Sequence, residues 1–140
     1  MSKDLENILV VSIEQAVAAP YLSSRLADAG ARVIKVERHE GDFARKYDDF
    51  VNGDSAYFVW LNRGKESIAL NLKDKKDLQV LKNIIKKSDI LIQNLAPGAF
   101  ERLGLNLKEL RDKHPKLITC SITGFGEKGP YSQSRVYDPV

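Results

Sequence analysis

The stretch that decides the fold is LADAGARVIKVE, residues 26–37. Its first part ends an expected helix, which Pro20 is well placed to open and Gly30 to close. Its second part, Arg32–Glu37, contains Val33, Ile34 and Val36 and has the length and composition of a β-strand. A helix that leads through one glycine into a strand is half of a βαβ unit, so this stretch predicts an α/β fold.

The same alternation recurs along the whole chain. Strands are expected at residues 8–13, 32–37, 67–72, 90–93 and 117–122, and helices at residues 20–29, 57–62, 73–87, 99–103 and 107–113. Residues 38–56 are expected to form a long loop with room for one helical turn, and residues 124–140 lack periodicity. We therefore expect one domain over residues 1–140, with a Rossmann-like open, mostly parallel sheet and helices on both faces.

Composition limits the classes of function. The chain has 140 residues, 22 Lys and Arg against 19 Asp and Glu, and a formal charge of +3, which is too small and scattered for a nucleic-acid stripe or a polybasic membrane patch. The single cysteine, Cys120, excludes an intrachain disulfide and is expected in the core. His39 and His114 have no partner at metal-ligand spacing, so no metal is expected. No apolar run reaches the length of a membrane span, and we expect a cytoplasmic protein.

In an open parallel sheet, ligands bind outside the carboxyl ends of the strands. The expected strand exits carry Gln15–Ala19, Arg38, Lys73, Asn94, and Arg135 with Tyr137. Cations and amides that converge on one edge suit an anionic nucleotide, because Arg and Lys pair with phosphate and Asn can donate or accept. The alternative is a set of surface cations that happen to lie near loops.

Arg38 is the most informative of these residues. In dinucleotide-binding folds the end of the second strand meets the ribose, and an Arg there accommodates a ribose phosphate. Arg38 therefore suggests CoA or NADP. A NADP-dependent oxidoreductase domain would need a glycine-rich turn after the first strand, and Gln15–Ala19 contains no glycine.

The pattern GFGEKG at residues 124–129 follows an expected strand. Turn residues and no helix come after it, so we expect a loop in which the glycines permit positive φ.

Several short stretches occur in a characteristic order. They are QAVAAP at 15–20, LADAGARVIKVE at 26–37, LNRGKES at 61–67, LNLK at 70–73, NLAPG at 94–98, RLG at 102–104, GFG at 124–126, GPY at 129–131 and YD at 137–138. Taken together, these stretches resemble the class III CoA-transferase family, to which formyl-CoA transferase belongs. The resemblance extends from Ile8 to Val140.

The resemblance implies an enzyme that moves CoA between an acyl-CoA thioester and a small free carboxylate, through an aspartyl anhydride and an enzyme–CoA thioester. The nucleophilic Asp is expected beyond residue 140, so that Asp138 is not the nucleophile, Tyr137 has at most a supporting role and the 140-residue chain alone is inactive. An interlocked homodimer is expected for the full-length enzyme, with no nucleic-acid or membrane partner. By motif matching, the contacts to coenzyme A fall on Ala16, Val17, Arg38, Leu70, Asn71, Leu72, Lys73, Asn94, Leu95, Ala96, Arg102, Arg135, Val136, Tyr137 and Asp138.

Two further alternatives stay open. The related acyl-CoA racemases carry a His where this chain has Tyr137, and a phenol with a pKa near ~10 is a poor base at neutral pH, which favours transfer. The second alternative is a fragment that binds CoA and does not catalyse its transfer.

Some relatives have Gln where this chain has Val17, so the identity of the acyl group stays open. We also expect the sheet to expose apolar surface that later segments cover in the whole enzyme.

Overall fold

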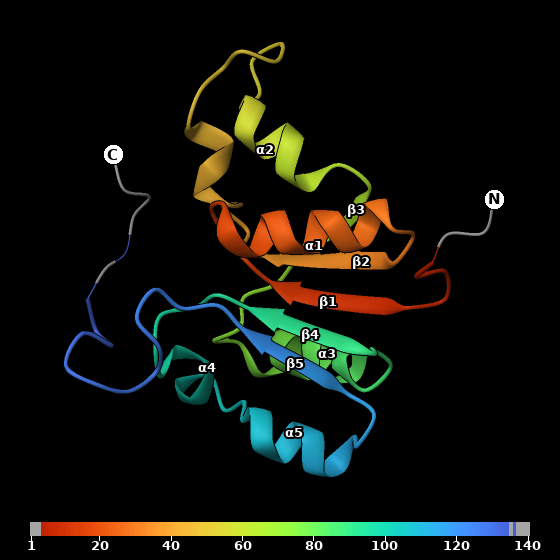
Figure 1. Cartoon of the computed structure of the whole chain (residues 1–140), viewed down its shortest axis with the longest axis vertical. Coiled ribbons are helices and arrows are strands. Elements are labelled where there is room, and N and C mark those ends of the chain that lie inside the picture. The colour runs from red at the N-terminus through yellow and green to blue at the C-terminus, as the bar shows by residue number, and fades with distance from the viewer. Residues whose placement is uncertain (1–3, 135, 137–140) are drawn as a thin grey trace.

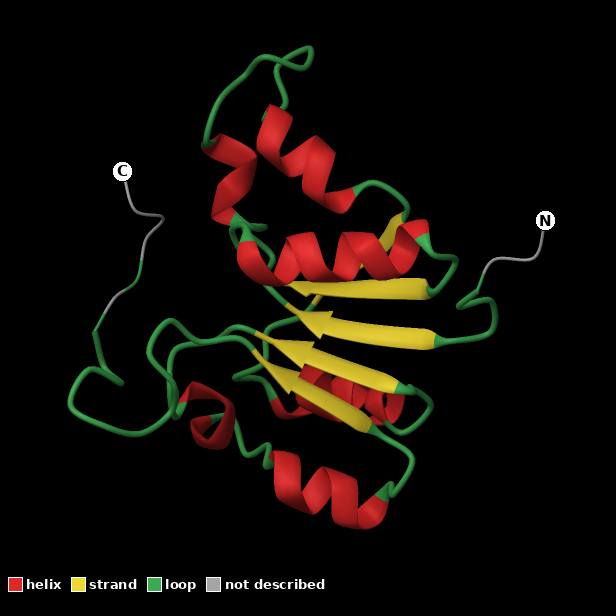
Figure 2. Cartoon of the chain, viewed as in Figure 1, coloured by secondary structure: helices red, strands yellow, loops and turns green. Residues whose placement is uncertain are grey.

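The computed structural model describes residues 4–134 and Val136. Its centre is a five-stranded sheet in which every neighbouring pair of strands is parallel (Figures 1 and 2). The strands are β1 (Leu9–Ile13), β2 (Arg32–Glu37), β3 (Lys65–Ala69), β4 (Ile90–Gln93) and β5 (Ile118–Ser121). The helices are α1 (Ala18–Asp28), the 3₁₀ helix η1 (Phe43–Lys46), α2 (Ala56–Asn62), α3 (Lys75–Ile85), α4 (Ala99–Arg102) and α5 (Leu107–Lys113). The predicted fold class is confirmed.

The strand order is β3-β2-β1-β4-β5. The chain builds outward from β1 to β3 on one side, then returns to the other side of β1 for β4 and β5. The connections from β1 and β4 therefore diverge, and a ligand crevice is expected outside their carboxyl ends. The arrowheads of β1, β2, β4 and β5 point to the same edge of the sheet in Figure 2, and β3 is parallel to β2.

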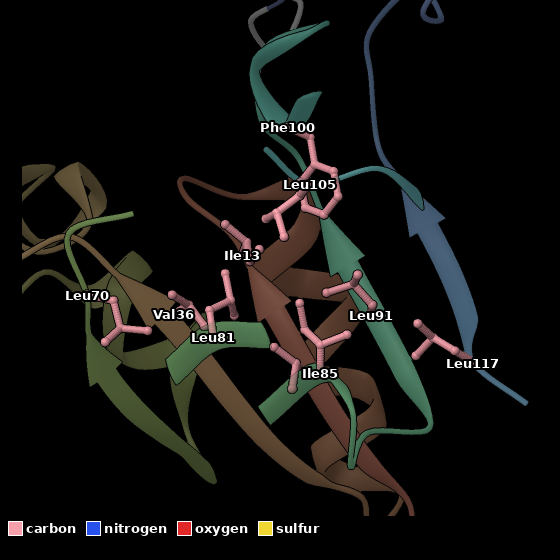
Figure 3. Close-up of a cluster of buried hydrophobic side chains, with 10 residues drawn as sticks. Ile13, Val36, Leu70, Leu81, Ile85, Leu91, Phe100, Leu105 and Leu117 are labelled. Carbon is pink, nitrogen blue, oxygen red and sulfur yellow. The ribbon is translucent and has the colours of Figure 1, made fainter. Parts of the chain in front are cut away.

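The two faces of the sheet are covered by different helices, as predicted (Figure 1). Helix α1 packs its apolar side on Val10, Val33 and Ile92, and α2 lies against α1. Helices α3, α4 and α5 cover the opposite face, where Leu81 of α3 is fully buried and packs in one cluster with strand residues that point to this side (Figure 3). Alternate residues along a strand point to opposite faces, which divides the core in this way.

Most elements lie where the sequence predicts them, and the differences have local causes. Helix α1 begins two residues before the expected start at Pro20, which therefore lies within its first turn, and Gly30 ends the helix with φ 107°. Helix α3 is shorter than expected because Asp74 caps it, its carboxylate accepting hydrogen bonds from the backbone N–H groups of Lys76 and Asp77. Strand β3 was expected at 67–72 but begins at Lys65, a charged residue whose side chain points inward.

Apolar side chains remain on the surface of the described residues. Five aromatic rings form a chain of contacts with centroid separations of 5.8–6.3 Å, and they come from Tyr21, Phe43, Tyr47, Tyr57 and Trp60. On the edge strand β5, Ile118 is 62% exposed, and Cys120 is partly rather than fully buried. No helix in the described part of the chain is long and apolar enough to cross a membrane.

Candidate functional site

An open cleft of about 880 Å³ lies at the carboxyl edge of the sheet, outside the ends of β1, β2 and β3 and beside α4. It is lined by residues 13–15, 36–42, 70–73, Leu95, Ala99, Arg102 and Leu103. A smaller groove of about 200 Å³ between α3 and α5 contains none of the expected coenzyme residues. The larger cleft therefore matches the crevice that the topology predicts.

Three cations line this cleft without a carboxylate partner. Arg38 follows β2, Lys73 follows β3, and Arg102 ends α4. All three are exposed, and none forms an ion pair with any residue that the structure describes. Unpaired cations at one opening attract an anionic ligand, because their charge is not neutralised by the protein itself.

Three carboxylates that line the cleft, those of Glu14, Glu37 and Asp42, are each neutralised by a basic side chain. Glu14 and Asp42 are bonded to buried lysines, and Glu37 is bonded to Arg45. Glu40 is the remaining carboxylate that lines the cleft, and it lies on the exposed rim. Among the described residues, three free cations against one free carboxylate give the cleft a net positive charge.

The Glu37 carboxyl, which lines the cleft, is held in place by several hydrogen bonds. Burial raises the pKa of its carboxyl, but hydrogen bonds from Arg45, Ser67 and the backbone N–H of Asp42 lower it, and the result is a pKa of about 2. The guanidinium of Arg45 donates two hydrogen bonds, of 2.8 and 3.1 Å, to the Glu37 oxygens. Glu37 therefore stays ionised and fixes the start of the loop that carries Arg38.

A buried ionic cluster lies beneath the loop that follows β1. It consists of Glu14, Lys35, Asp42 and Lys65, whose side chains are at most 2% exposed. Lys65 Nζ lies 2.7 Å from Glu14 Oε1, and Lys35 Nζ lies 2.8 Å from Asp42 Oδ2 and 3.5 Å from Glu14 Oε1. Burial lowers the pKa of Lys65, and the nearby Glu14 carboxylate opposes that change.

The sequence reading missed this cluster, although β2 contains a signal for it. Val33, Lys35 and Glu37 occupy alternate positions of one strand and so share a face. Lys35 is 1% exposed, and a lysine on the apolar-facing side of a strand needs buried acids nearby. No polar side-chain atom that is buried in the described residues lacks a hydrogen-bond partner.

The backbone after β1 is held in a strained conformation. Ala16 has φ 63°, the left-handed region that residues with a Cβ avoid at a cost of about 1–2 kcal/mol. Its N–H donates to Asp42 Oδ1 at 3.0 Å. The preceding N–H, of Gln15, donates to Asn94 Oδ1 at 3.0 Å, and Asn94 Nδ2 donates back to the Gln15 carbonyl at 2.8 Å. Asn94 thus holds the β1 and β4 exits together, and its amide is already bonded to the backbone.

The expected coenzyme residues fall into three groups. Those that line the cleft are Arg38, Leu70, Asn71, Leu72, Lys73, Leu95 and Arg102. Those that lie outside its lining are Ala16, Val17, Asn94, Ala96 and Val136. Arg135, Tyr137 and Asp138 lie outside the described residues. Asn94 nevertheless shapes the cleft, because it fixes the backbone of Gln15, which lines it, and Ala16 is the next residue along the chain.

The glycine pattern at 124–129 belongs to a loop, as expected, since no helix follows it among residues 124–134. Gly126 and Gly129 have positive φ, but Gly124 does not. Gly124 is required for a different reason: a Cβ at this position would lie 1.9 Å from Cγ2 of Val136. The close approach of Val136 closes the loop on itself.

The described residues contain no group of three or more His, Cys, Asp and Glu that could hold a metal ion. His39, one of the two histidines, lines the cleft, and its Nε2 lies 3.8 Å from Asp77 Oδ2.

These features agree with the results of comparison with known proteins. The model of the family described as "CoA-transferase family III" matches residues 5–140, and the chain belongs to this family. The resemblance noted in the sequence is confirmed.

Curated relatives support the same class. The chain is 40% identical over 136 residues to the acetyl-CoA:oxalate CoA-transferase of Acetobacter aceti, covering 96% of this chain and 35% of the relative. It is 39% identical to the human succinyl-CoA:glutarate CoA-transferase, covering 99% of this chain and 32% of the relative. It is 41% identical to the formyl-CoA:oxalate CoA-transferase of Bradyrhizobium sp., covering 100% of this chain and 33% of the relative. The chain therefore spans about a third of the length of these relatives.

Solved structures agree on the fold. A CaiB/BaiF family protein from Brucella suis superposes with a TM-score of 0.90 at 35% identity, over 99% of this chain and 38% of that protein. The protein Rv3272 from Mycobacterium tuberculosis gives a TM-score of 0.90 at 33% identity, over 98% of this chain and 38% of that protein.

Proposed function

We propose that residues 1–140 form the coenzyme-binding N-terminal part of an enzyme that transfers CoA between an acyl-CoA thioester and a free carboxylate. The observation that carries the proposal is the cleft at the strand exits, where Arg38, Lys73 and Arg102 have no carboxylate partner among residues 4–134 and Val136. It occurs in a chain of CoA-transferase family III. CoA carries a pyrophosphate and a ribose phosphate, and these anions suit three separate cations.

The proposal assigns roles along the cleft. Arg38 and Lys73 follow adjacent strands and would bind phosphate groups, while Arg102 would reach the same ligand from α4. The backbone at 70–72 and Leu95 would contact the remainder of the nucleotide. Ala16, Val17, Asn94, Ala96 and residues 135–138 are proposed as coenzyme contacts on the basis of the family resemblance.

The chemical step is proposed to need residues beyond 140. By resemblance to the family, an Asp would attack the acyl-CoA thioester to give an aspartyl anhydride and free CoA. The CoA thiolate would then attack the aspartyl carbonyl of the anhydride, which releases the donor carboxylate and leaves an enzyme–CoA thioester. We propose that a small carboxylic acid accepts the CoA, that the whole enzyme is a cytoplasmic homodimer, and that the 140-residue chain alone does not catalyse the transfer. The CoA-transferases among the relatives support the class of reaction.

Calorimetric titration with CoA and, in parallel, NADPH tests the binding site. We expect CoA to bind and the affinity to fall about tenfold or more in Arg38→Ala and in Lys73→Ala, because a hydrogen bond to a charged group contributes about 1.5–3 kcal/mol. Lys116→Ala is the matched control: Lys116 is also exposed and forms no ion pair with the described residues, but it precedes β5 at the opposite edge of the sheet. Absence of CoA binding, or preferential binding of NADPH, would overturn the proposal.

A further inference from the structure

The loop after β1, residues 14–17, lies beside both the cleft and the buried ionic cluster, two of whose members, Glu14 and Asp42, also line the cleft. Glu14 and Gln15 line the cleft on one side of this loop. On the other side, the Glu14 carboxylate belongs to the cluster and also accepts hydrogen bonds from Ser12 Oγ at 2.5 Å and Ser23 Oγ at 2.6 Å. The bonds of the Glu14 carboxylate within the cluster therefore fix the position of this part of the cleft wall.

Asp42 connects the cluster to the loop backbone. Its Oδ1 accepts from the N–H groups of Ala16 and Ala44, both at 3.0 Å, and its Oδ2 accepts from Lys35 Nζ at 2.8 Å. The N–H of Asp42 donates to Glu37 Oε2 at 2.9 Å. Asp42 is 5% exposed, so each of these bonds is largely shielded from water. One carboxylate thus joins Ala16, the start of η1 and a lysine of β2.

Ala16 needs this support because of its conformation. A residue with a Cβ favours negative φ, and a strained φ persists where surrounding contacts fix it. Asn94 fixes the preceding residue through Gln15, and Asp42 fixes Ala16 itself. Loss of the Asp42 contact leaves the left-handed turn without its own hydrogen-bond partner.

We propose that Asp42, held by Lys35, is a positioning residue that keeps Ala16 in the left-handed conformation and so sets the cleft wall against which the coenzyme binds. The identity of the ligand rests on the proposed function, whereas the conformational part depends on the geometry alone. Asp42 also lines the cleft, but both of its carboxylate oxygens are bonded within the protein, so its role in this inference is to fix the loop.

The test combines amide hydrogen exchange with CoA titration on Asp42→Ala, Ala16→Gly and the double variant. We expect the Ala16 amide to exchange at least about tenfold faster in Asp42→Ala, and the CoA affinity to fall by about fivefold or more, as expected for loss of a charge-assisted hydrogen bond. Ala16→Gly in the Asp42→Ala background should restore part of the CoA affinity, because glycine adopts φ near +60° without the steric cost. A merely structural role for Asp42 would not give this rescue.

Asp48→Ala is the matched control. Asp48 is only partly buried, but like Asp42 it accepts hydrogen bonds from a backbone N–H, that of Ala56, and from a side chain, Ser55 Oγ, and it lies outside the cleft. We expect it to lower the unfolding temperature and to leave both Ala16 exchange and CoA affinity at the wild-type values. If Asp42→Ala does not fold, Asp42→Asn replaces it, with exchange of Ala16 expected to rise at least about threefold because its amide cannot neutralise Lys35.

Each result leads to a decision. Unchanged Ala16 exchange in the Asp42 variants would overturn the inference. Faster exchange with unchanged CoA affinity, or no rescue by Ala16→Gly, would overturn the link between the loop conformation and the coenzyme. A wild-type chain that fails to bind CoA would overturn the proposed function instead, and the exchange rates would still decide whether Asp42 fixes Ala16.

Discussion

The Glu37 carboxylate offers a quantitative prediction about stability and pH. Its pKa lies at about 2 in the folded chain, against an ordinary value of 4.5. At about 1.4 kcal/mol for each tenfold change in proton affinity, this corresponds to an upper value of about 3 kcal/mol. The Arg45 side chain is 42% exposed, so solvent screens part of the interaction. We expect about 1–2 kcal/mol of the free energy of unfolding to depend on ionised Glu37.

The sign follows from the lowered pKa. A group whose folded-state pKa is depressed stabilises the fold fully above its unfolded pKa, and this contribution disappears as the pH falls through the folded-state pKa. Glu37→Gln should therefore be less stable than wild type by about 1–2 kcal/mol near neutral pH. The difference should shrink as the pH falls from about 5 towards 2, where Glu37 itself becomes protonated.

Urea unfolding of both proteins over this pH range measures the difference directly. Glu66→Gln is the matched control, since Glu66 also accepts two hydrogen bonds from one guanidinium, that of Arg32, but both side chains are more than half exposed. Its effect should be smaller than that of Glu37→Gln at every pH. A Glu37→Gln difference that stays constant across the range, or equals that of the control, would refute the reasoning.

Two other substitutions probe the two faces of the sheet, and urea unfolding measures both. Lys35→Met should destabilise the fold by about 3–5 kcal/mol, because it leaves Asp42 buried without its nearest cation; Lys116→Met, at an exposed site, is the control, and a loss equal to the control would contradict the prediction. Leu81→Ala should lower the free energy of unfolding by about 2–5 kcal/mol, since Leu81 is fully buried. The adjacent Val80 is 41% exposed, and Val80→Ala should have a much smaller effect; similar losses at both positions would show that α3 does not pack as described.

The sequence predicts the framework well where apolar periodicity and helix-ending residues agree. β2, β4 and α5 have the expected bounds, because each is an uninterrupted pattern between clear boundary residues. β3 begins two residues early because Lys65 belongs to the strand although it is charged. Its ammonium is bonded to Glu14, a residue 51 positions away in the chain, and a local pattern cannot indicate such a partner.

The site is predicted in part for a related reason. Parallel strands bring their carboxyl ends to one edge, so topology alone places Arg38 and Lys73 together. Residue type alone does not say what a polar group binds. Asn94 was expected to present its amide to a ligand, whereas both polar atoms of that amide are bonded to the backbone of Gln15. The sequence places Asn94 directly after β4, as the structure does, but it does not indicate the partner of the Asn94 side chain.

The two faces of the sheet therefore contribute differently to the molecule. The face covered by α3 is apolar, and its burial contributes stability through the hydrophobic effect, which is not directional. Beneath the loop after β1, the opposite face holds two buried lysines and two buried acids, and ion pairs of this kind contribute less to net stability than apolar residues of similar volume would. Their directional bonds fix one strained residue, Ala16, at the edge where the ligand crevice lies. Changes at Leu81 should consequently alter stability and leave the coenzyme affinity of the folded fraction intact, whereas changes at Asp42 should alter the affinity even where the chain stays folded.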